Sequence, residues 1–482
     1  MLLDSSFVVA DPAPLGIHRV VAQYAFHGAA FAAWSGIDFV VVECTADGAF
    51  ARREGPLVGP APAPPAAPPV GSLSARVALK VLRYASRVIS AGGLLAASLL
   101  PVKPLRRGSA ALARMMDALA SAARSDIAVP ERQGDTLVPG AGDILFCPGF
   151  WHEMDFTLYE RAQANGAEVV FLVHDILPML MPTFYQYPWR RDFHRAVLRA
   201  LDMGGYFYAV SGRSLEDLRA FAAQCDMKVR GAVAYNGFSP ADERPVADPA
   251  ALDEEARKVL ASRPWLMVGT VEPKKGHRDA IATFEMLWQQ GYTRPLVIIG
   301  RLGWLSEDMP EIICGSPWFG RRLFWYQNLG DAGLAAHYEQ AHALLFGSLA
   351  EGFGLPPLEA AARGLPVLAR DIPVVREVLG PNVRYFSGPR DLRAAVLALE
   401  DESVHAATRC NLAAARWYSW RDVVQCVMAD LLQPAPARSQ GGALMARLSR
   451  HPLSGPPTAE APVAAEMKLV EPVEPILSRM QA

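Results

Sequence analysis

Short apolar runs alternate with helical segments twice along this chain, and this alternation constrains the fold more than any other feature. In the first half, strand-like runs are expected at 7–10, 39–43, 143–147, 169–173 and 206–210, with helical segments such as 17–34 between them. The alternation starts afresh at 265–268 and continues through 296–299, 323–326, 343–346 and 367–369. This pattern is typical of parallel sheets covered by helices. We therefore expect an α/β protein with two doubly wound, Rossmann-like domains and a ligand cleft beyond the carboxyl ends of their strands.

The length of 482 residues fits this division, because one hydrophobic core seldom serves more than about 300 residues. Strand and helix signals stop near 240, and the following stretch is polar and contains proline, as interdomain linkers often do. The expected parts are an N-terminal domain at 1–240, a linker at 241–256, a C-terminal domain at 257–415, a helix at 416–433 that packs back towards the N-terminal domain, and a disordered tail at 434–482.

An insertion is expected at about 55–125, within the N-terminal domain. It opens with a proline-rich stretch at 55–70, which cannot donate a regular hydrogen-bond ladder and is interpreted as an exposed spacer. Nine Lys or Arg residues follow between 72 and 124, against one acid, Asp117. A basic amphipathic helix within 72–103 would suit anionic lipid headgroups, but a surface helix packed on its own domain fits the same pattern.

Bulk properties narrow the classes of function. The 47 Lys and Arg residues nearly balance the 49 Asp and Glu residues, so the whole chain lacks the charge signature of a nucleic-acid binder. The six cysteines form no C-x-x-C pair, which disfavours a zinc site or a disulfide framework and favours a reducing cytoplasm. No secretory signal is expected at the N-terminus, and the apolar stretch 88–102 is shorter than the roughly 20 residues of a spanning helix.

The loop that follows the apolar run 343–346 has the chemistry of a site for a phosphorylated sugar. Gly352 and Gly354 allow a close backbone approach, and Pro356 suits the first turn of a helix. The helix N-terminus offers N–H groups and a positive dipole end to a diphosphate. Glu351 and Glu359 flank this backbone with carboxylates that only accept hydrogen bonds, which suits a ligand with hydroxyl groups at both ends.

The segment from Phe346 to Val367 resembles the E-x7-E signature of glycosyltransferase family 4 (group 1), which has the GT-B fold. The resemblance implies that Glu351 contacts the transferred sugar and that Glu359 holds the ribose. It also implies that the amides of Phe353, Gly354 and Leu355 cradle the sugar and phosphate. It makes the C-terminal domain the nucleotide-sugar donor domain and the N-terminal domain the acceptor side. It covers most of 6–432.

Five further segments resemble the same family. The loop at 268–277 is similar to its basic donor loop, and the resemblance implies that Lys275 and Lys274 neutralise the diphosphate leaving group, a task that a metal would otherwise perform. Many members have an arginine at the position of Thr270, and a subgroup has one at the position of Lys274. His174, in a strand-end His-Asp pair, is implied to reach the donor sugar, and Gly16 stands in a loop that resembles the phosphate-approaching loop. The segments 209–213 and 236–238 also match and are interpreted as structural.

The resemblance implies a metal-independent, retaining hexosyltransferase in which the leaving phosphate helps to deprotonate the acceptor and Glu351 orients the sugar. The forms of the 268–277 and 171–178 segments are most similar to mannosyltransferase-type members of bacterial exopolysaccharide or O-antigen pathways. We therefore expect GDP-mannose as donor, a lipid-linked glycan as acceptor, no cofactor, and a cytoplasmic location, peripheral on the plasma membrane if 72–103 binds lipid. A GT-B sugar-nucleotide epimerase, a phosphorylase and a non-catalytic nucleotide-sugar-binding scaffold remain as alternatives.

Overall fold

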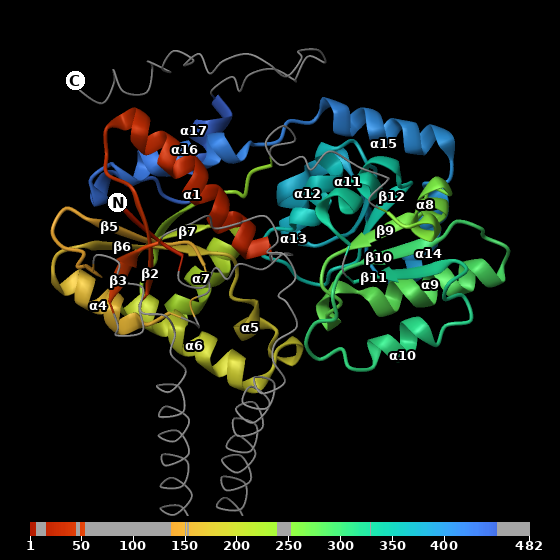
Figure 1. Ribbon diagram of the computed structural model, residues 1–482, viewed down its shortest axis with the longest axis horizontal. Coiled ribbons are helices and arrows are strands. Elements are labelled where there is room, and N and C mark those ends of the chain that lie inside the picture. The colour runs from red at the N-terminus through yellow and green to blue at the C-terminus, as the bar shows by residue number, and fades with distance from the viewer. Residues whose placement is uncertain are drawn as a thin grey trace, which may run out of the picture.

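The computed structural model describes residues 1–5, 16–44, 49–53, 136–149, 151, 154–238, 252–327 and 329–450. The predicted strand at 7–10, the insertion at 55–125 with its basic segment 72–103, and the tail beyond 450 lie outside these residues. Two helix-covered sheets lie side by side, one in each half of the chain (Figure 1). The predicted α/β class with two Rossmann-like units is confirmed.

The N-terminal sheet has the strand order β4-β3-β2-β1-β5-β6-β7-β8. Its strands are β1 (Leu2–Asp4), β2 (Val40–Cys44), β3 (Phe50–Arg52), β4 (Thr136–Leu137), β5 (Ile144–Cys147), β6 (Glu168–Val173), β7 (Tyr206–Ala209) and β8 (Arg230–Val233). All neighbours from β2 to β8 pair in parallel, whereas β3 and β4 add an antiparallel edge. The carboxyl ends of the parallel strands therefore share one edge of the sheet.

Helices cover both faces of this sheet. They are α1 (Gly16–Ser35), α4 (Phe156–Ala164), α5 (Leu177–Leu180), α6 (Tyr187–Asp202) and α7 (Gly212–Gln224), with a 3-10 turn η2 (Pro182–Phe184) between α5 and α6. In Figure 1, α1 lies above the sheet beside α16 (Trp420–Leu431), and α4 and α6 lie below it. Helix α16 packs against α1, so the chain returns to the N-terminal domain after the C-terminal sheet is complete.

The C-terminal sheet is parallel throughout and has the order β11-β10-β9-β12-β13-β14. The strands are β9 (Trp265–Val268), β10 (Leu296–Ile299), β11 (Leu323–Tyr326), β12 (Ala343–Phe346), β13 (Val367–Arg370) and β14 (Arg384–Phe386). The helices are α8 (Glu254–Ala261), α9 (His277–Gln289), α10 (Met309–Cys314), α11 (Asp331–Gln340), α12 (Leu355–Ala362), α13 (Pro373–Leu379), α14 (Pro389–Ala398) and α15 (Glu402–Ala414), with 3-10 turns η4 (Pro273–Lys275) and η5 (Gly380–Asn382). In Figure 1, α11 and α12 lie above the sheet and α9 and α10 below it.

The central strands are continuous apolar runs because both of their faces are buried. All four residues of β10 and of β12 are buried. One face of the C-terminal sheet has its own apolar cluster, which lies between the sheet and the helices α9 and α14. The apolar cluster on the other face is continuous with the core of the N-terminal domain. This continuity gives the two domains a packed junction.

The tail prediction was wrong for residues 434–450. After α16 the chain forms a 3-10 turn, η6 (Ala435–Ala437), and a helix, α17 (Ala443–Arg450). The N–H of Val233 donates to the carbonyl of Gly441 at 2.8 Å, so this segment adds to the edge strand β8. The buried carboxylate of Asp430 accepts from Tyr208 Oη at 2.8 Å and from Ser439 Oγ at 2.6 Å. Partners more than 200 residues away order a segment whose own composition is that of a disordered tail.

The predicted linker also ends earlier than expected, because α8 begins at Glu254 with Asp253 as its N-cap. Among the residues that the structure describes, no helix has both the length and the apolar character needed to span a bilayer.

Candidate functional site

The loop between β12 and α12 carries Glu351 to the junction of the two domains. Gly354 caps α12 with a φ of 96°, a left-handed conformation that L side chains rarely adopt, and Pro356 lies in the first turn of that helix. The first N–H groups of a helix have no partner within it, so the amides of Phe353, Gly354 and Leu355 lie where an anion is favoured. The side chain of Phe353 itself is buried and packs against Tyr235.

The basic loop after β9 lies directly on this glutamate loop. The N–H of Leu349 donates to the carbonyl of Lys274 at 2.8 Å, which ties the two loops together. Lys275 Nζ then reaches Glu351 Oε1 at 2.6 Å, with both side chains more than four-fifths buried. Burial alone would raise the pKa of Glu351, but the charges of Lys275 and Lys274 outweigh it and hold the pKa below its usual value. Glu351 is therefore ionised at neutral pH.

Lys274 points to the N-terminal domain. Its Nζ donates to Tyr185 Oη at 3.0 Å and lies 4.0 Å from a carboxylate oxygen of Glu272. Burial opposes the charge on Lys274, but the carboxylates of Glu351, Asp175 and Glu272 outweigh it and raise its pKa. Burial raises the pKa of Glu272 more than the two lysines lower it. We call Glu272, Lys274, Lys275 and Glu351 the lysine–glutamate cluster.

His174 follows the last residue of β6, and its backbone carbonyl lies against Gly352, the residue after Glu351. Its Nε2 lies 2.8 Å from the carbonyl oxygen of Pro148, and since a carbonyl only accepts, Nε2 carries the proton. Burial lowers the pKa of His174, so the ring is neutral at pH 7 with Nδ1 as its acceptor atom. Asp175 accepts from the N–H of Leu177 at 2.9 Å and so fixes the start of α5.

The loop after β6, which carries His174, and the loop after β12, which carries Gly352, are in direct contact. A Cβ atom at Gly352 would overlap the carbonyl oxygen of His174, so only glycine allows this approach. Ser211 Oγ donates to the carbonyl of Gly352 at 2.7 Å, and Ser214 Oγ donates to that of His174 at 3.0 Å. The predicted structural role of 209–213 is consistent with these hydrogen bonds, which hold His174 beside Glu351.

Glu359 lies one turn into α12, after the loop that carries Glu351. Its Oε2 accepts from Tyr338 Oη at 2.8 Å, and its Oε1 lies 3.5 Å from Arg19 Nη1 of the N-terminal domain. Arg19 also contacts Asp331 at 2.9 Å. Gly16 is the first residue of the same helix, α1; the residues of its predicted phosphate loop before Gly16 lie outside the described residues, and those after it belong to the helix. The N-terminus of α1 thus faces the donor-domain glutamate.

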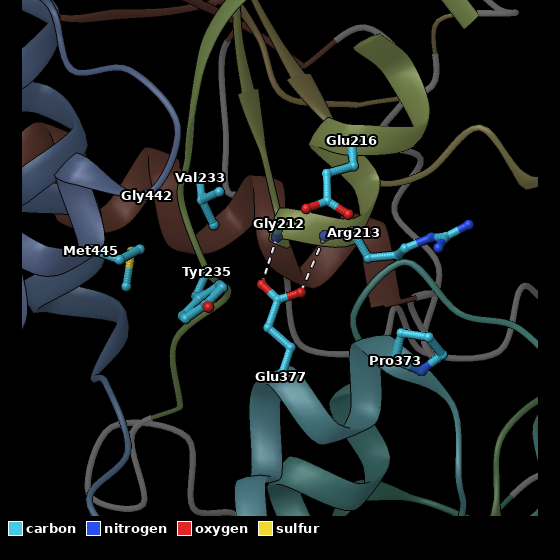
Figure 2. A pocket seen from close by; sticks show the side chains of 9 residues that line it. All are labelled: Gly212, Arg213, Glu216, Val233, Tyr235, Pro373, Glu377, Gly442 and Met445. Atoms are coloured by element: carbon cyan, nitrogen blue, oxygen red, sulfur yellow. Dashed lines mark hydrogen bonds between the residues drawn. The ribbon is translucent and has the colours of Figure 1, made fainter. Parts of the chain in front are cut away.

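A cavity of about 470 Å³ lies at a second contact between the domains, shown in Figure 2. The carboxylate of Glu377, from α13, accepts from the N–H groups of Gly212 and Arg213 at 2.5 and 3.1 Å, and so caps α7. The lysine–glutamate cluster and His174 do not line this cavity. We therefore interpret the contact as part of the domain junction.

The structure thus brings Glu351, Lys275, Lys274 and His174 together, with Glu359 and Gly16 on one flank. Sequence reasoning missed Tyr185, Glu272, Tyr338 and Arg19, which contact the predicted residues. Glu272 could have been found, because it precedes the lysine pair in the same loop. The others come from distant helices and turns.

Known proteins resemble this chain in sequence and in fold. Residues 253–411 match the family described as glycosyl transferases group 1. The Escherichia coli serotype-specific mannosyltransferase WbdA is 34% identical over 296 residues, which cover 59% of this chain and 36% of WbdA. The Escherichia coli O-antigen chain mannosyltransferase B is 28% identical over 286 residues, covering 56% of this chain and 71% of that protein. This chain therefore spans only about a third of the length of WbdA.

Two solved structures share the fold along almost the whole of their length. Anabaena HepE in complex with UDP and glucose has a TM-score of 0.50 at 15% identity and covers 89% of this chain and 98% of its own. Sucrose-phosphate synthase from Thermosynechococcus elongatus has a TM-score of 0.52 at 16% identity, covering 89% and 97%. The GT-B fold and the resemblance to bacterial mannosyltransferase-type members of group 1 are confirmed.

Proposed function

We propose, from a C-terminal domain that matches the group 1 glycosyl transferases, that this chain transfers a hexose from a nucleotide-diphosphate sugar to a glycan acceptor. The observation that carries the proposal is the buried Lys275–Glu351 pair, held at the junction of two Rossmann-like domains opposite His174. The mannosyltransferase names of the relatives support mannose as the sugar and an O-antigen-type or exopolysaccharide glycan as the acceptor. The segments at 268–277 and 171–178 favour GDP-mannose as the donor.

The donor would extend along the N-terminus of α12. Lys275 and Lys274 lie beside that terminus and supply two positive charges to the diphosphate, which is why we expect no metal ion and no cofactor. Glu359 would accept hydrogen bonds from the ribose hydroxyls, with Tyr338 holding its carboxylate in place. Gly16, at the start of α1, would approach the phosphates from the other domain.

The site residues have protonation states that suit orientation of the sugar. Because Glu351 is ionised, it accepts hydrogen bonds from sugar hydroxyls and has no proton to give. His174 is neutral and offers Nδ1 to another hydroxyl. In the proposed step the bond from the anomeric carbon to the diphosphate breaks, the acceptor oxygen bonds on the same face, and its proton passes to the leaving phosphate oxygen. Retention then needs no enzyme nucleophile.

The acceptor is proposed to be lipid-linked, with the protein in the cytoplasm and peripheral to the membrane. The basic segment 72–103 motivates this part of the proposal, and it lies outside the described residues. Deletion of 72–103 should release the protein from vesicles that contain anionic lipid without lowering its melting temperature. Unchanged sedimentation of the deletion variant with those vesicles would contradict membrane binding through this segment.

A donor screen tests the proposed function. The protein is incubated with a polyprenyl-diphosphate-linked sugar and, in turn, GDP-mannose, UDP-glucose and UDP-galactose, and the products are identified by mass spectrometry. Lys275→Met serves as the inactive variant, and Lys258→Met, which removes an exposed lysine paired with Glu254 on α8, serves as the matched control. We expect the acceptor to gain one hexose from GDP-mannose with the wild type and the control only.

Two outcomes of the screen would overturn the proposal. An isomerised sugar nucleotide with no change in the acceptor would assign a GT-B epimerase. Binding of GDP-mannose, seen as a higher melting temperature, with no turnover of any donor would assign a non-catalytic scaffold.

A further inference from the structure

A cluster of stacked aromatic rings bridges the two domains next to the lysine–glutamate cluster. Tyr185 and Trp189 belong to the N-terminal domain, and Trp304 belongs to the loop after β10. The ring centroids of Tyr185 and Trp189 are 5.3 Å apart, and those of Trp189 and Trp304 are 5.9 Å apart with an interplanar angle of 28°. We call these three residues the aromatic platform.

The platform fixes an exposed tryptophan in one orientation. Trp304 stacks on Trp189, and its Nε1 donates to the carbonyl of Phe184 across the junction at 3.0 Å. The side chain is nevertheless 37% exposed, and its neighbours Leu302 and Leu305 are exposed as well. Leu305 has a φ of 54°, a conformation that costs free energy in a residue other than glycine. A rigid, exposed apolar surface of this kind is typical of a ligand-binding surface.

The platform is continuous with the lysine–glutamate cluster at two points. Tyr185 Oη accepts from Lys274 at 3.0 Å. The loop that carries Trp304 also packs on the basic loop. The N–H of Gly303 donates to the carbonyl of Val271 at 2.9 Å, and a Cβ atom at Gly303 would touch the side chain of Glu272. A ligand that stacks on Trp304 would therefore lie next to the groups proposed to bind the diphosphate.

The position of the platform separates it from the proposed nucleoside site. Glu359 lies on α12 and contacts Arg19 of α1, and both helices are in the upper part of Figure 1. Trp189 belongs to α6, and Trp304, in the loop that leads to α10, contacts it and η2; α6 and α10 are in the lower part of the same view. The diphosphate groups would occupy the centre, so a nucleoside held by Glu359 points away from Trp304. This leaves the second substrate as the occupant of the platform.

We propose that Trp304, supported by Trp189 and Tyr185, forms an acceptor subsite that binds a hexopyranose ring of the glycan by stacking against its C–H face. The inference rests on the proposed function and names a binding site for its acceptor. A pyranose ring has an apolar face of C–H groups, which matches an exposed aromatic surface. The ring of Trp304 is already oriented by its hydrogen bond and its stacking, so little rotamer entropy is lost on binding.

The test compares Trp304→Ala, Trp304→Phe and the wild type with α-linked mannotriose as a soluble probe. A matched control is Trp34→Ala, which removes another exposed tryptophan, on α1, whose ring centroid lies 5.7 Å from that of Phe31. The affinity for mannotriose is measured by calorimetry in the absence of donor, and the affinity for GDP is measured separately. Steady-state kinetics with saturating GDP-mannose give KM for mannotriose.

We expect Trp304→Ala to weaken mannotriose binding and to raise its KM by about tenfold, from the loss of one aromatic face. Trp304→Phe should recover most of this loss, and GDP affinity should stay within about twofold. Trp34→Ala should change neither affinity.

Two results would overturn the subsite. One is an unchanged mannotriose affinity in Trp304→Ala. The other is a parallel loss of GDP affinity, which would assign the platform to the nucleobase instead. Direct mannotriose binding that depends on Trp304, without transfer from any donor, would support the subsite and overturn only the proposed function.

Discussion

Replacement of Lys275 by methionine tests the role of the Lys275–Glu351 pair in stability as well as in activity. The substitution keeps an apolar chain of similar length but leaves a buried carboxylate without its 2.6 Å partner. Removal of one member of a buried ion pair costs about 3–5 kcal/mol. Lys274 remains nearby and offsets part of this, so we expect a loss of about 3 kcal/mol at pH 7. For a domain of this size the melting temperature should then fall by about 6–12 °C.

The pH dependence of the loss has a definite sign. In the wild type, the pKa of Glu351 is held below 4.5, so this group stabilises the fold above pH 4.5 and the contribution is lost as the pH falls through the folded-state pKa. In Lys275→Met, the positive charge that outweighed burial is gone, so we expect burial to raise the pKa of Glu351 above 4.5. The variant then carries a cost at neutral pH that protonation relieves. The gap in melting temperature between wild type and variant should narrow between pH 7 and pH 4.5.

A double-mutant cycle separates the pair from other effects. Glu351→Gln added to Lys275→Met removes the unpaired charge and should restore about half or more of the lost stability. We expect neither the single variant Lys275→Met nor the double variant to transfer sugar. The control cycle on the exposed pair Lys258–Glu254 should give a coupling energy below about 1 kcal/mol. The melting temperatures are measured by scanning calorimetry. Equal melting temperatures for wild type and Lys275→Met at pH 7, or a coupling energy no larger than that of the control, would refute the reasoning.

Three further predictions concern the neighbouring groups. Glu359→Gln should weaken GDP binding by about tenfold in calorimetry, since a charged acceptor to the ribose is lost; an unchanged affinity would remove Glu359 from the site. Gly352→Ala should abolish transfer while GDP binding persists, because the new Cβ atom forces the glutamate loop away from His174; wild-type turnover would contradict this close contact. EDTA should leave the transfer rate within about twofold, as Lys275 and Lys274 supply the charge; a loss reversed by Mg²⁺ would show that a metal ion takes part.

The parts of the site that the sequence predicted lie in short continuous segments. Glu351 and Glu359 occur within one loop and helix, and Lys274 and Lys275 within one turn, so the order of residues alone places them together. Strands β9, β10, β11 and β12 have the bounds expected from their apolar runs, because strands buried on both faces carry an uninterrupted pattern.

The parts that the sequence did not predict depend on contacts between distant residues. Tyr185 is 89 residues from the lysine that it contacts, and Arg19 meets Glu359 only when the two domains pack together. The antiparallel edge was missed because β3 and β4 are only three and two residues long and are separated by the insertion. Helix α17 was missed because the order of its segment comes from pairing with β8 and from the buried Asp430.

The central claim is that this chain transfers a hexose with retention at a site built on Glu351 and Lys275. The most direct measurement follows the anomeric proton signals by NMR while the wild-type protein acts on GDP-mannose and the glycan acceptor. The account predicts that the α-anomeric signal of the donor is replaced by an α-glycosidic signal of the product, and that Glu351→Gln gives no product signal. A β-glycosidic product, or the same product from Glu351→Gln at an equal rate, would contradict the account.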